Sequence, residues 1–246
     1  MQEGDSESNS ENPKPYNHPV LPLRGDRKSG AFPIATWTIV ALNVAIFLWD
    51  RGGQVFGPGI HFEDLAMRPR EVVTAALSRG DYFPIVSLFT SMFLHGGLMH
   101  LLGNLLYLFV FGTAVEEALG TTRYVLYYLA WGFVAAAAQI WVDPRSLVPV
   151  LGASGAIGGV LGAYLLLFPS SRIQIVIPPL FFLSFEVYAW ILLGLWFLYQ
   201  VFFPQQGVAN WAHIGGFLAG MVTVLIVRRG LGGEKSEDGP FLSQAD

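Results

Sequence analysis

The absence of charge over long stretches constrains this chain more than any other feature. Five runs contain no Lys, Arg, Asp or Glu, and they are 21, 34, 19, 26 and 41 residues long. They lie between Lys28 and Asp50, Asp81 and Glu116, Arg123 and Asp143, Arg145 and Arg172, and Glu186 and Arg228. A helix that crosses a bilayer needs about 20 mostly apolar residues. Each run is close to that length or longer, so we predict a protein that crosses a membrane several times.

The composition excludes several other classes of protein. Charged residues make up 13% of the 246 residues, about half of the roughly 25% in soluble domains, which excludes a soluble globular protein and a disordered chain. The net charge is −4, with no basic patch to bind nucleic acid. The chain has no Cys, which excludes a disulfide framework, a thiolate metal site and a Cys nucleophile.

The predicted fold is all-α, a polytopic membrane protein with six transmembrane helices. Backbone groups in lipid must be hydrogen-bonded within the segment, so unbroken apolar runs without alternation predict helices rather than barrel strands. The longest run must be divided, and the turn residues Phe203 to Gly207 divide it. The predicted spans are about 32–49, 91–114, 122–142, 149–168, 184–203 and 208–228.

The segments outside the spans are polar. We expect residues 1–30 to be a disordered cytoplasmic leader and residues 231–246 to be a polar cytoplasmic tail. Between the first two spans, Phe62 to Leu77 predicts a short amphipathic helix at the interface. Residues 173–183 predict a connection that touches the membrane surface. With the N-terminus inside, nine Lys and Arg lie on the inner side and five on the outer side, which predicts that both termini are cytoplasmic.

A few polar side chains interrupt the predicted spans, where they need a reason because polar groups in lipid are costly. His95, His100 and Asn104 lie in the second span, Ser154 in the fourth and His213 in the sixth. These three spans all start at the outer face. Ser154 and His213 each lie about five residues inside, roughly 8 Å deep at about 1.5 Å per residue. A nucleophile, imidazoles and an amide thus lie at comparable depth.

Glycine spacing indicates which spans touch. Gly155 and Gly159 are four residues apart in the fourth span, as are Gly216 and Gly220 in the sixth. Small residues at this spacing let membrane helices approach closely. Contact between these spans would bring His213 to Ser154. In the alternative interpretation the polar residues serve packing only, since an intramembrane Ser commonly bonds its own backbone.

These residue types suit acyl transfer. A Ser hydroxyl is a weak nucleophile and needs an adjacent base, for which a His is suited. Donors must also face the developing oxyanion, and His100, Asn104 and the Ser154 backbone N–H are the candidates. His95 is either a further donor or a positioning residue. No Asp lies in any span, so we predict a Ser–His dyad rather than a triad. We expect no metal and no cofactor.

At these residues the chain resembles the rhomboid intramembrane serine proteases. The similarity rests on His95-x4-His100-x3-Asn104, Gly152-Ala153-Ser154-Gly155 and Ala212-His213-x2-Gly216-x3-Gly220. The resemblance implies that residues 31–230 form a rhomboid-like six-helix protease domain. Ser154 would be the nucleophile and His213 the general base. His100, Asn104 and the Ser154 amide would form the oxyanion hole. His95, Gly152, Gly155, Gly216 and Gly220 would support the site.

The resemblance also implies a substrate and a location. Substrates would be transmembrane proteins in the lipid bilayer, cut near the outer end of a span at small residues. The active site would open to the outer face of a membrane, for which we expect a bacterial plasma membrane. Some family members carry Trp-Arg where this chain has Val86-Ser87, and an aromatic residue where it has Gly158. We therefore expect another ring, Trp211 or Tyr164, to pack on His213.

Two other functions compete with a protease. A catalytically silent rhomboid-like protein would bind membrane clients without cutting them, but it would not need Ser154, His213 and Asn104 together. A transporter or channel would use the histidines as a proton or metal path, but it would show paired carboxylates in the spans. A three-His zinc site would leave Ser154 without a role.

Overall fold

The computed structural model describes residues 32–59, 61–77, 82–177 and 180–232. The predicted leader lies outside the described residues. So does the predicted tail, except that residues 231 and 232 end the last helix.

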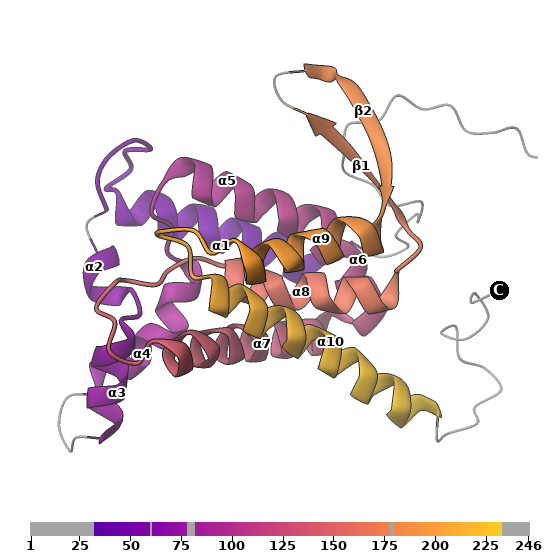
Figure 1. The fold of residues 1–246 in the computed structure, drawn as a ribbon. Coiled ribbons are helices and arrows are strands. Elements are labelled where there is room, and N and C mark those ends of the chain that lie inside the picture. The colour runs from indigo at the N-terminus through magenta and orange to yellow at the C-terminus, as the bar shows by residue number, and fades with distance from the viewer. Residues whose placement is uncertain (1–31, 60, 78–81, 178–179, 233–246) are drawn as a thin grey trace, which may run out of the picture.

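The fold is helical, as predicted. Its first half contains α1 (Ile34–Asp50), α2 (Phe62–Leu65), α3 (Pro69–Leu77), α4 (Phe83–Thr90), the 3₁₀ turn η1 (Ser91–Phe93), α5 (Leu98–Tyr107), the π-helical turn η2 (Leu108–Gly112) and α6 (Thr113–Leu119). The second half contains α7 (Thr121–Val142), α8 (Ser154–Leu167), β1 (Arg172–Ile177), β2 (Leu180–Tyr188), α9 (Ala189–Phe202) and α10 (Asn210–Gly232). Figure 1 shows the long helices side by side, with the β-hairpin projecting from the bundle.

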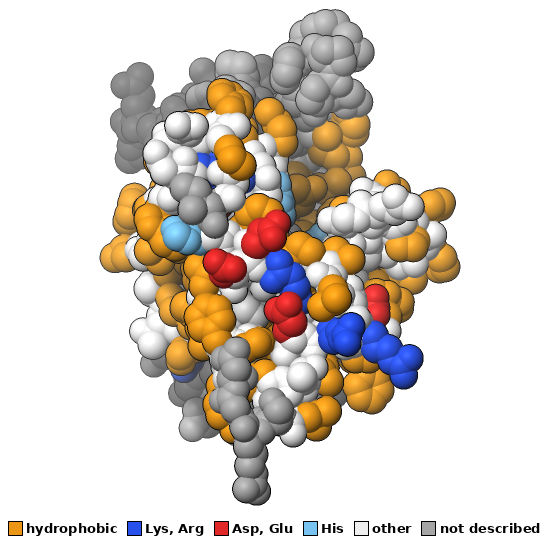
Figure 2. Space-filling view, turned by 90° about the vertical axis from the view of Figure 1, so that its left-hand side faces the viewer, with side chains coloured by type: hydrophobic (Ala, Val, Ile, Leu, Met, Phe, Trp, Pro, Cys, Tyr) orange, Lys and Arg blue, Asp and Glu red, His pale blue; other side chains and the backbone are white. Residues whose placement is uncertain are grey.

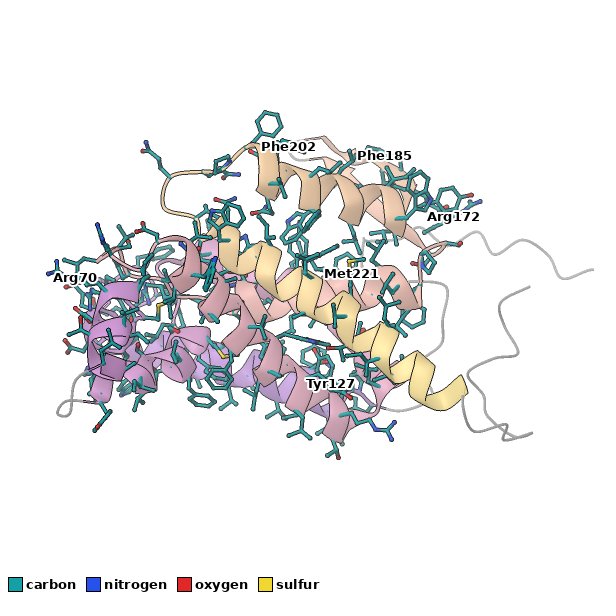
Figure 3. The ribbon with its side chains drawn as sticks, turned by 60° about the horizontal axis from the view of Figure 1, so that its bottom comes forward. Arg70, Tyr127, Arg172, Phe185, Phe202 and Met221 are labelled. Carbon is teal, nitrogen blue, oxygen red and sulfur yellow. The ribbon has the colours of Figure 1, made fainter. Side chains whose placement is uncertain are left out.

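Among the described residues, three helical stretches are long and apolar enough to cross a membrane: Leu98–Leu119, Thr121–Val142 and Asn210–Val227. Four shorter apolar helices accompany them: Ile34–Asp50, Phe83–Phe93, Ser154–Leu167 and Ala189–Phe202. The number of six spans therefore stays a prediction. Arg70 and Arg172 lie at opposite ends of the bundle (Figure 3). Charged side chains of both signs gather on the face shown in Figure 2. Around α2 and α3, Arg68 pairs with Glu63 and Glu71.

Helix α8 is the centre of the bundle. Every residue from 156 to 164 is buried, and the helix contacts α5, α6, α7, α9 and α10. A helix that is apolar on all sides belongs in a core. Among the described elements, its contact with α10 is the most extensive. A Cβ on Gly216 would overlap the Gly155 carbonyl, and a Cβ on Gly220 would overlap the Gly159 carbonyl. The fourth and sixth predicted spans therefore touch where the glycine spacing places them.

The predicted second span, 91–114, is not one continuous helix. Its first residues form η1, the chain then leaves helical geometry at Leu94, and α5 begins at Leu98. Gly96 and Gly97 have low helix propensity. His95 lies in this non-helical segment, and its buried ring is hydrogen-bonded to the Phe93 carbonyl oxygen. The preceding helix α4, which starts with Pro84 in its first turn, was not anticipated.

The predicted fourth span also starts later than expected. Residues 149–153 precede the helix, and Ser154 is the first residue of α8 rather than about five residues inside it. Val150 forms an isolated antiparallel β-bridge with Met67, and Gly152 has a φ of +121°. Such a φ is rare in residues with a side chain and cannot continue a helix. The nucleophile candidate therefore lies at a helix N-terminus.

Residues 173–177 and 180–183 belong to the two strands of an antiparallel hairpin, and the predicted fifth span starts too early. Arg172 pairs with Tyr188 and Gln174 with Glu186. The Arg172 guanidinium and the Glu186 carboxylate are 3.1 Å apart. Residues 184–188 lie in β2, so the helix begins at Ala189. The β-branched residues Ile173, Ile175 and Val176 favour a strand, but within a long apolar run they also fit a buried helix.

At the end of the bundle opposite Ser154, the buried carboxylate of Glu116 joins three helices. It accepts hydrogen bonds from the backbone N–H groups of Ala35 and Thr36 at 2.9 and 2.8 Å. It also accepts the hydroxyls of Thr36 and Thr121 at 2.8 and 2.9 Å. A carboxylate is stabilised at the N-terminus of a helix by the helix dipole. Glu116 thus fixes the first turn of α1 against α6 and α7.

We predict that Glu116→Ala lowers the free energy of unfolding by about 2–4 kcal/mol, because hydrogen bonds to a charged group contribute about 1.5–3 kcal/mol each and their buried donors would lose a partner. Thermal unfolding in detergent micelles measures the change. Glu117→Ala is the matched control, and it should have a smaller effect because Glu117 is exposed. Equal destabilisation by the two variants would contradict the assignment.

Candidate active site

Ser154 and His213 are in hydrogen-bond contact. The Ser154 Oγ and the His213 Nε2 are 2.8 Å apart. Ser154 opens α8, and His213 lies in the first turn of α10. Both side chains are half-buried. The structure thus brings together the two residues that we predict as nucleophile and base, and the distance permits direct proton transfer between them.

Glycines make this contact possible. A Cβ on Gly158 would lie 2.8 Å from the His213 carbonyl oxygen, and a Cβ on Gly155 would lie 2.8 Å from the Ala135 methyl group. Any side chain at position 158 would push α10 away from α8 and separate His213 from Ser154. This close approach explains why position 158 carries no aromatic ring.

The ring beside His213 comes from α9. Trp196 lies with its ring centroid 5.8 Å from that of His213, at an interplanar angle of 34°. The expectation of Trp211 or Tyr164 was wrong. Trp211 is 45% exposed, and Tyr164 packs edge-on against Phe111. The register of α9 over α10 decides which ring meets His213, and no local pattern in the sequence fixes that register.

A residue that the sequence analysis missed occupies the other side of the imidazole. The Gln200 Oε1 and the His213 Nδ1 are 2.8 Å apart, and the Gln200 side chain is buried. The predicted Ser–His pair therefore has a third polar neighbour. The sequence does contain an indication of this residue, because Gln200 is the single amide side chain in the apolar segment that forms α9.

Two predicted oxyanion donors face the backbone that leads into Ser154. A Cβ on Gly152 would lie 2.7 Å from the His100 Nε2 and 3.5 Å from the Asn104 Nδ2. Gly152 therefore leaves room for both side chains beside the start of α8. The Ser154 backbone N–H is among the first of the helix, and such N–H groups have no partner within the helix. These groups together could donate hydrogen bonds to an anionic oxygen near the Ser154 hydroxyl.

His95 holds Asn104 in place. Its Nδ1 lies 3.2 Å from the Phe93 carbonyl oxygen, which can only accept, so Nδ1 carries the proton. The Nε2 is then an acceptor, and the Asn104 amide donates to it at 2.9 Å. His95 is fully buried. Of the two roles considered for His95, this geometry favours the positioning role.

A buried arginine, also missed from the sequence, supports the loop that carries His95. The Arg51 guanidinium donates to the His95 carbonyl oxygen at 2.9 Å and pairs with Asp50 at 3.2 Å. It also lies over the Phe47 ring, 4.0 Å from its centroid. The end of α1 thereby anchors the active-site loop. In the sequence, Asp50 and Arg51 follow the end of a predicted span, where charged residues are usually exposed to solvent. For this reason the sequence did not indicate a buried role for Arg51.

Ser154 also borders a small pocket that is lined mainly by small side chains. Most of its lining residues are Gly or Ala, and Met67 and Met92 are among the larger ones. The small lining residues are Gly132, Ala135, Ala136, Gly152, Gly155, Ala156, Ala209 and Ala212. The pocket can therefore accept a small side chain next to the Ser154 hydroxyl.

The described histidines do not form a cluster that could hold a metal ion. In the described ranges, no three His, Cys, Asp or Glu side chains lie close enough together to hold a metal ion. Both ring nitrogens of His213 have hydrogen-bond partners in Gln200 and Ser154, and both of His95 have partners in Phe93 and Asn104. A zinc site would have to break these bonds.

Comparisons with known proteins show what the whole chain is similar to. A family model described as the Rhomboid domain matches residues 83–230. Rhomboid protease GluP of Bacillus subtilis (strain 168) is 32% identical over 189 residues, which are 76% of this chain and 34% of GluP. Rhomboid protease AarA of Providencia stuartii is 29% identical over 203 residues, 75% of this chain and 69% of AarA. Rhomboid protein 1, mitochondrial, of Saccharomyces cerevisiae is 25% identical over 232 residues, which are 80% of this chain and 64% of the yeast protein. The chain thus spans about a third of GluP and under two thirds of the yeast protein.

We predict that Asn104→Ala slows acylation of Ser154 by about 10²-fold or more, because loss of one oxyanion donor has that effect in serine proteases. His95→Ala should slow it less, since Asn104 remains but loses its acceptor. The rate of Ser154 labelling by a fluorophosphonate measures both. His61→Ala is the matched control, because the His61 ring stacks on Trp49 and only its backbone N–H bonds Asp50. Wild-type labelling of Asn104→Ala would refute the donor role.

Proposed function

The chain belongs to the rhomboid family, and on that premise we propose that it is an intramembrane serine endopeptidase. It hydrolyses peptide bonds within or near transmembrane segments of other membrane proteins. The observation that carries the proposal is the 2.8 Å contact between the Ser154 Oγ and the His213 Nε2. The contact pairs a hydroxyl with a base inside an apolar helical bundle, where such a pair needs a functional reason.

The proposed reaction follows from the positions of these groups. The Ser154 oxygen attacks the carbonyl carbon of the scissile bond while the His213 Nε2 takes the hydroxyl proton. The carbonyl oxygen becomes an oxyanion, which accepts hydrogen bonds from His100, Asn104 and the Ser154 backbone N–H. The tetrahedral intermediate collapses as His213 passes its proton to the leaving amine. Water then adds to the acyl-enzyme with His213 again as base, which releases the acid product and regenerates Ser154.

The surroundings of Ser154 support a substrate class and an orientation. The Gly- and Ala-lined pocket next to Ser154 suits a small side chain at the scissile bond. The protein is an integral membrane protein, as its family and its apolar helices indicate. The excess of Lys and Arg on one side favours cytoplasmic termini and an active site that opens to the outer face. The membrane that we propose is a bacterial plasma membrane.

Reconstitution in liposomes with a labelled transmembrane substrate tests the proposal. Ser154→Ala and His213→Ala should each lower cleavage by about 10⁴-fold or more, because residues that act as a unit lose nearly all activity together. Ser184→Ala is the matched control and should cleave like wild type, because Ser184 is exposed in β2. A metal chelator should leave cleavage unchanged.

Two outcomes would contradict the proposal. Undiminished cleavage by Ser154→Ala would refute the nucleophile. A wild-type protein that captures transmembrane segments but cuts none of a panel with small residues near the outer end would instead support the client-binding alternative, which the names of the protease relatives do not favour.

A further inference from the structure

Helix α9 is held to the bundle by few buried groups, and one of them is polar. Ala189, Leu193 and Gln200 are its buried residues, while most of its other side chains are half-buried or exposed. Backbone N–H groups of Ala189 and Trp190 tie its first turn to the carbonyl oxygens of Ser171 and Pro169 at 2.8 and 3.2 Å. At the other end of α9, Gln200 carries the buried polar contact.

The orientation of the Gln200 amide follows from a backbone donor. The Gln205 N–H donates to the Asn210 side chain at 3.1 Å, so the Asn210 atom that faces it must be the acceptor Oδ1. The Asn210 Nδ2 then points to Gln200, which is 2.8 Å away, and this contact requires the acceptor Oε1 on Gln200. Reversing either amide would bring two donors together. A backbone N–H, whose proton cannot move to another atom, therefore fixes both amides.

This arrangement selects one tautomer of His213. The Gln200 Oε1 faces the His213 Nδ1 at 2.8 Å, and an amide oxygen can only accept, so the Nδ1 carries the proton. The Nε2 is then unprotonated and accepts from the Ser154 hydroxyl at 2.8 Å. A general base needs this tautomer, because a protonated Nε2 could not take the Ser154 proton.

We propose that Gln200 is a positioning residue that holds His213 in its basic tautomer and orientation, and that Asn210 and the Gln205 N–H fix Gln200 for this role. The proposal rests on the proposed function, since it concerns how the base of that reaction is held. Gln200 acts through His213 and does not touch the reacting atoms. It takes the place of the Asp that the spans lack, but without a charge.

The position of Gln200 on α9 has a further consequence. His213 lies on α10, so its Nδ1 partner comes from a different helix. If the C-terminal end of α9 moves away from α10, the Nδ1–H loses its acceptor and Trp196 leaves the ring at the same time. Ser154 and His213 would stay in place, because α8 and α10 remain in contact. The base is therefore aligned only while α9 is docked.

Two substitutions at Gln200 separate positioning from packing. Met has nearly the same length but no strong acceptor, whereas Glu keeps an oxygen acceptor for the Nδ1–H. We expect Gln200→Met to lower kcat about tenfold or more with an unchanged KM. Loss of the charged Asp in a Ser–His–Asp triad costs about 10⁴-fold, and a neutral hydrogen bond is weaker. Gln200→Glu should stay within about threefold of wild type, because the acceptor is retained.

Control variants use neighbouring amides. Gln206→Ala should leave kcat unchanged, because the Gln206 side chain is exposed. Asn210→Ala should lower kcat in the wild-type background but should add little in the Gln200→Met background, because Asn210 acts through Gln200 and coupled residues are not additive. Cleavage of a transmembrane substrate in liposomes gives kcat and KM for each variant.

A second measurement does not depend on cleavage. The ¹⁵N chemical shifts of the five His residues, with His213 assigned by its substitution, report which ring nitrogen is protonated. Wild type should show His213 protonated at Nδ1 only. Gln200→Met should lose that preference, and Gln200→Glu should keep it.

The outcomes distinguish this proposal from the proposed function. Wild-type kcat in Gln200→Met, equal losses in the Met and Glu variants, or an unchanged His213 spectrum in Gln200→Met would overturn the positioning role while leaving the protease intact. A wild type that does not cleave, but whose His213 loses the Nδ1 proton in Gln200→Met, would overturn the protease and support the positioning contact.

Discussion

The rest of the structure depends on the backbone contact between α8 and α10. Apolar side chains gain little from meeting one another in lipid, so membrane helices associate through close packing. Here Gly155 and Gly159 face Gly216 and Gly220 so tightly that a Cβ on either of the last two would overlap a carbonyl group of α8. Because no side chain separates the two helices, residues at their adjacent ends can touch. The Ser154–His213 hydrogen bond follows from this contact.

Polar groups from other elements complete the site from two sides. On one side Arg51 holds the loop of His95, and His95 holds Asn104. On the other side Gln200 and Trp196 hold the His213 ring. None of these residues is among those with a buried side-chain polar atom that lacks a partner, as a low-dielectric interior requires. Through these hydrogen bonds, the geometry of the site depends on the position of the end of α1 and on the docking of α9.

The sequence was sufficient for the helical class and for the residues that converge at the start of α8. Its charge-free runs are long, and polar residues stand out in them. Gln200, Trp196 and Arg51 could not be assigned, because their roles depend on how α9 and α1 are placed against other helices. The start of α8 was misplaced because the φ of Gly152 is a tertiary feature. The hairpin was missed because its β-branched residues continue an apolar run that also fits a helix.

The central claim is that the α8–α10 contact makes Ser154 reactive through His213. Intact-mass analysis and peptide mapping after treatment with a fluorophosphonate test this claim most directly. The account predicts one adduct, on Ser154, that forms in the wild-type protein and is lost in His213→Ala. An adduct on another residue, or labelling of Ser154 at the wild-type rate in His213→Ala, would contradict it.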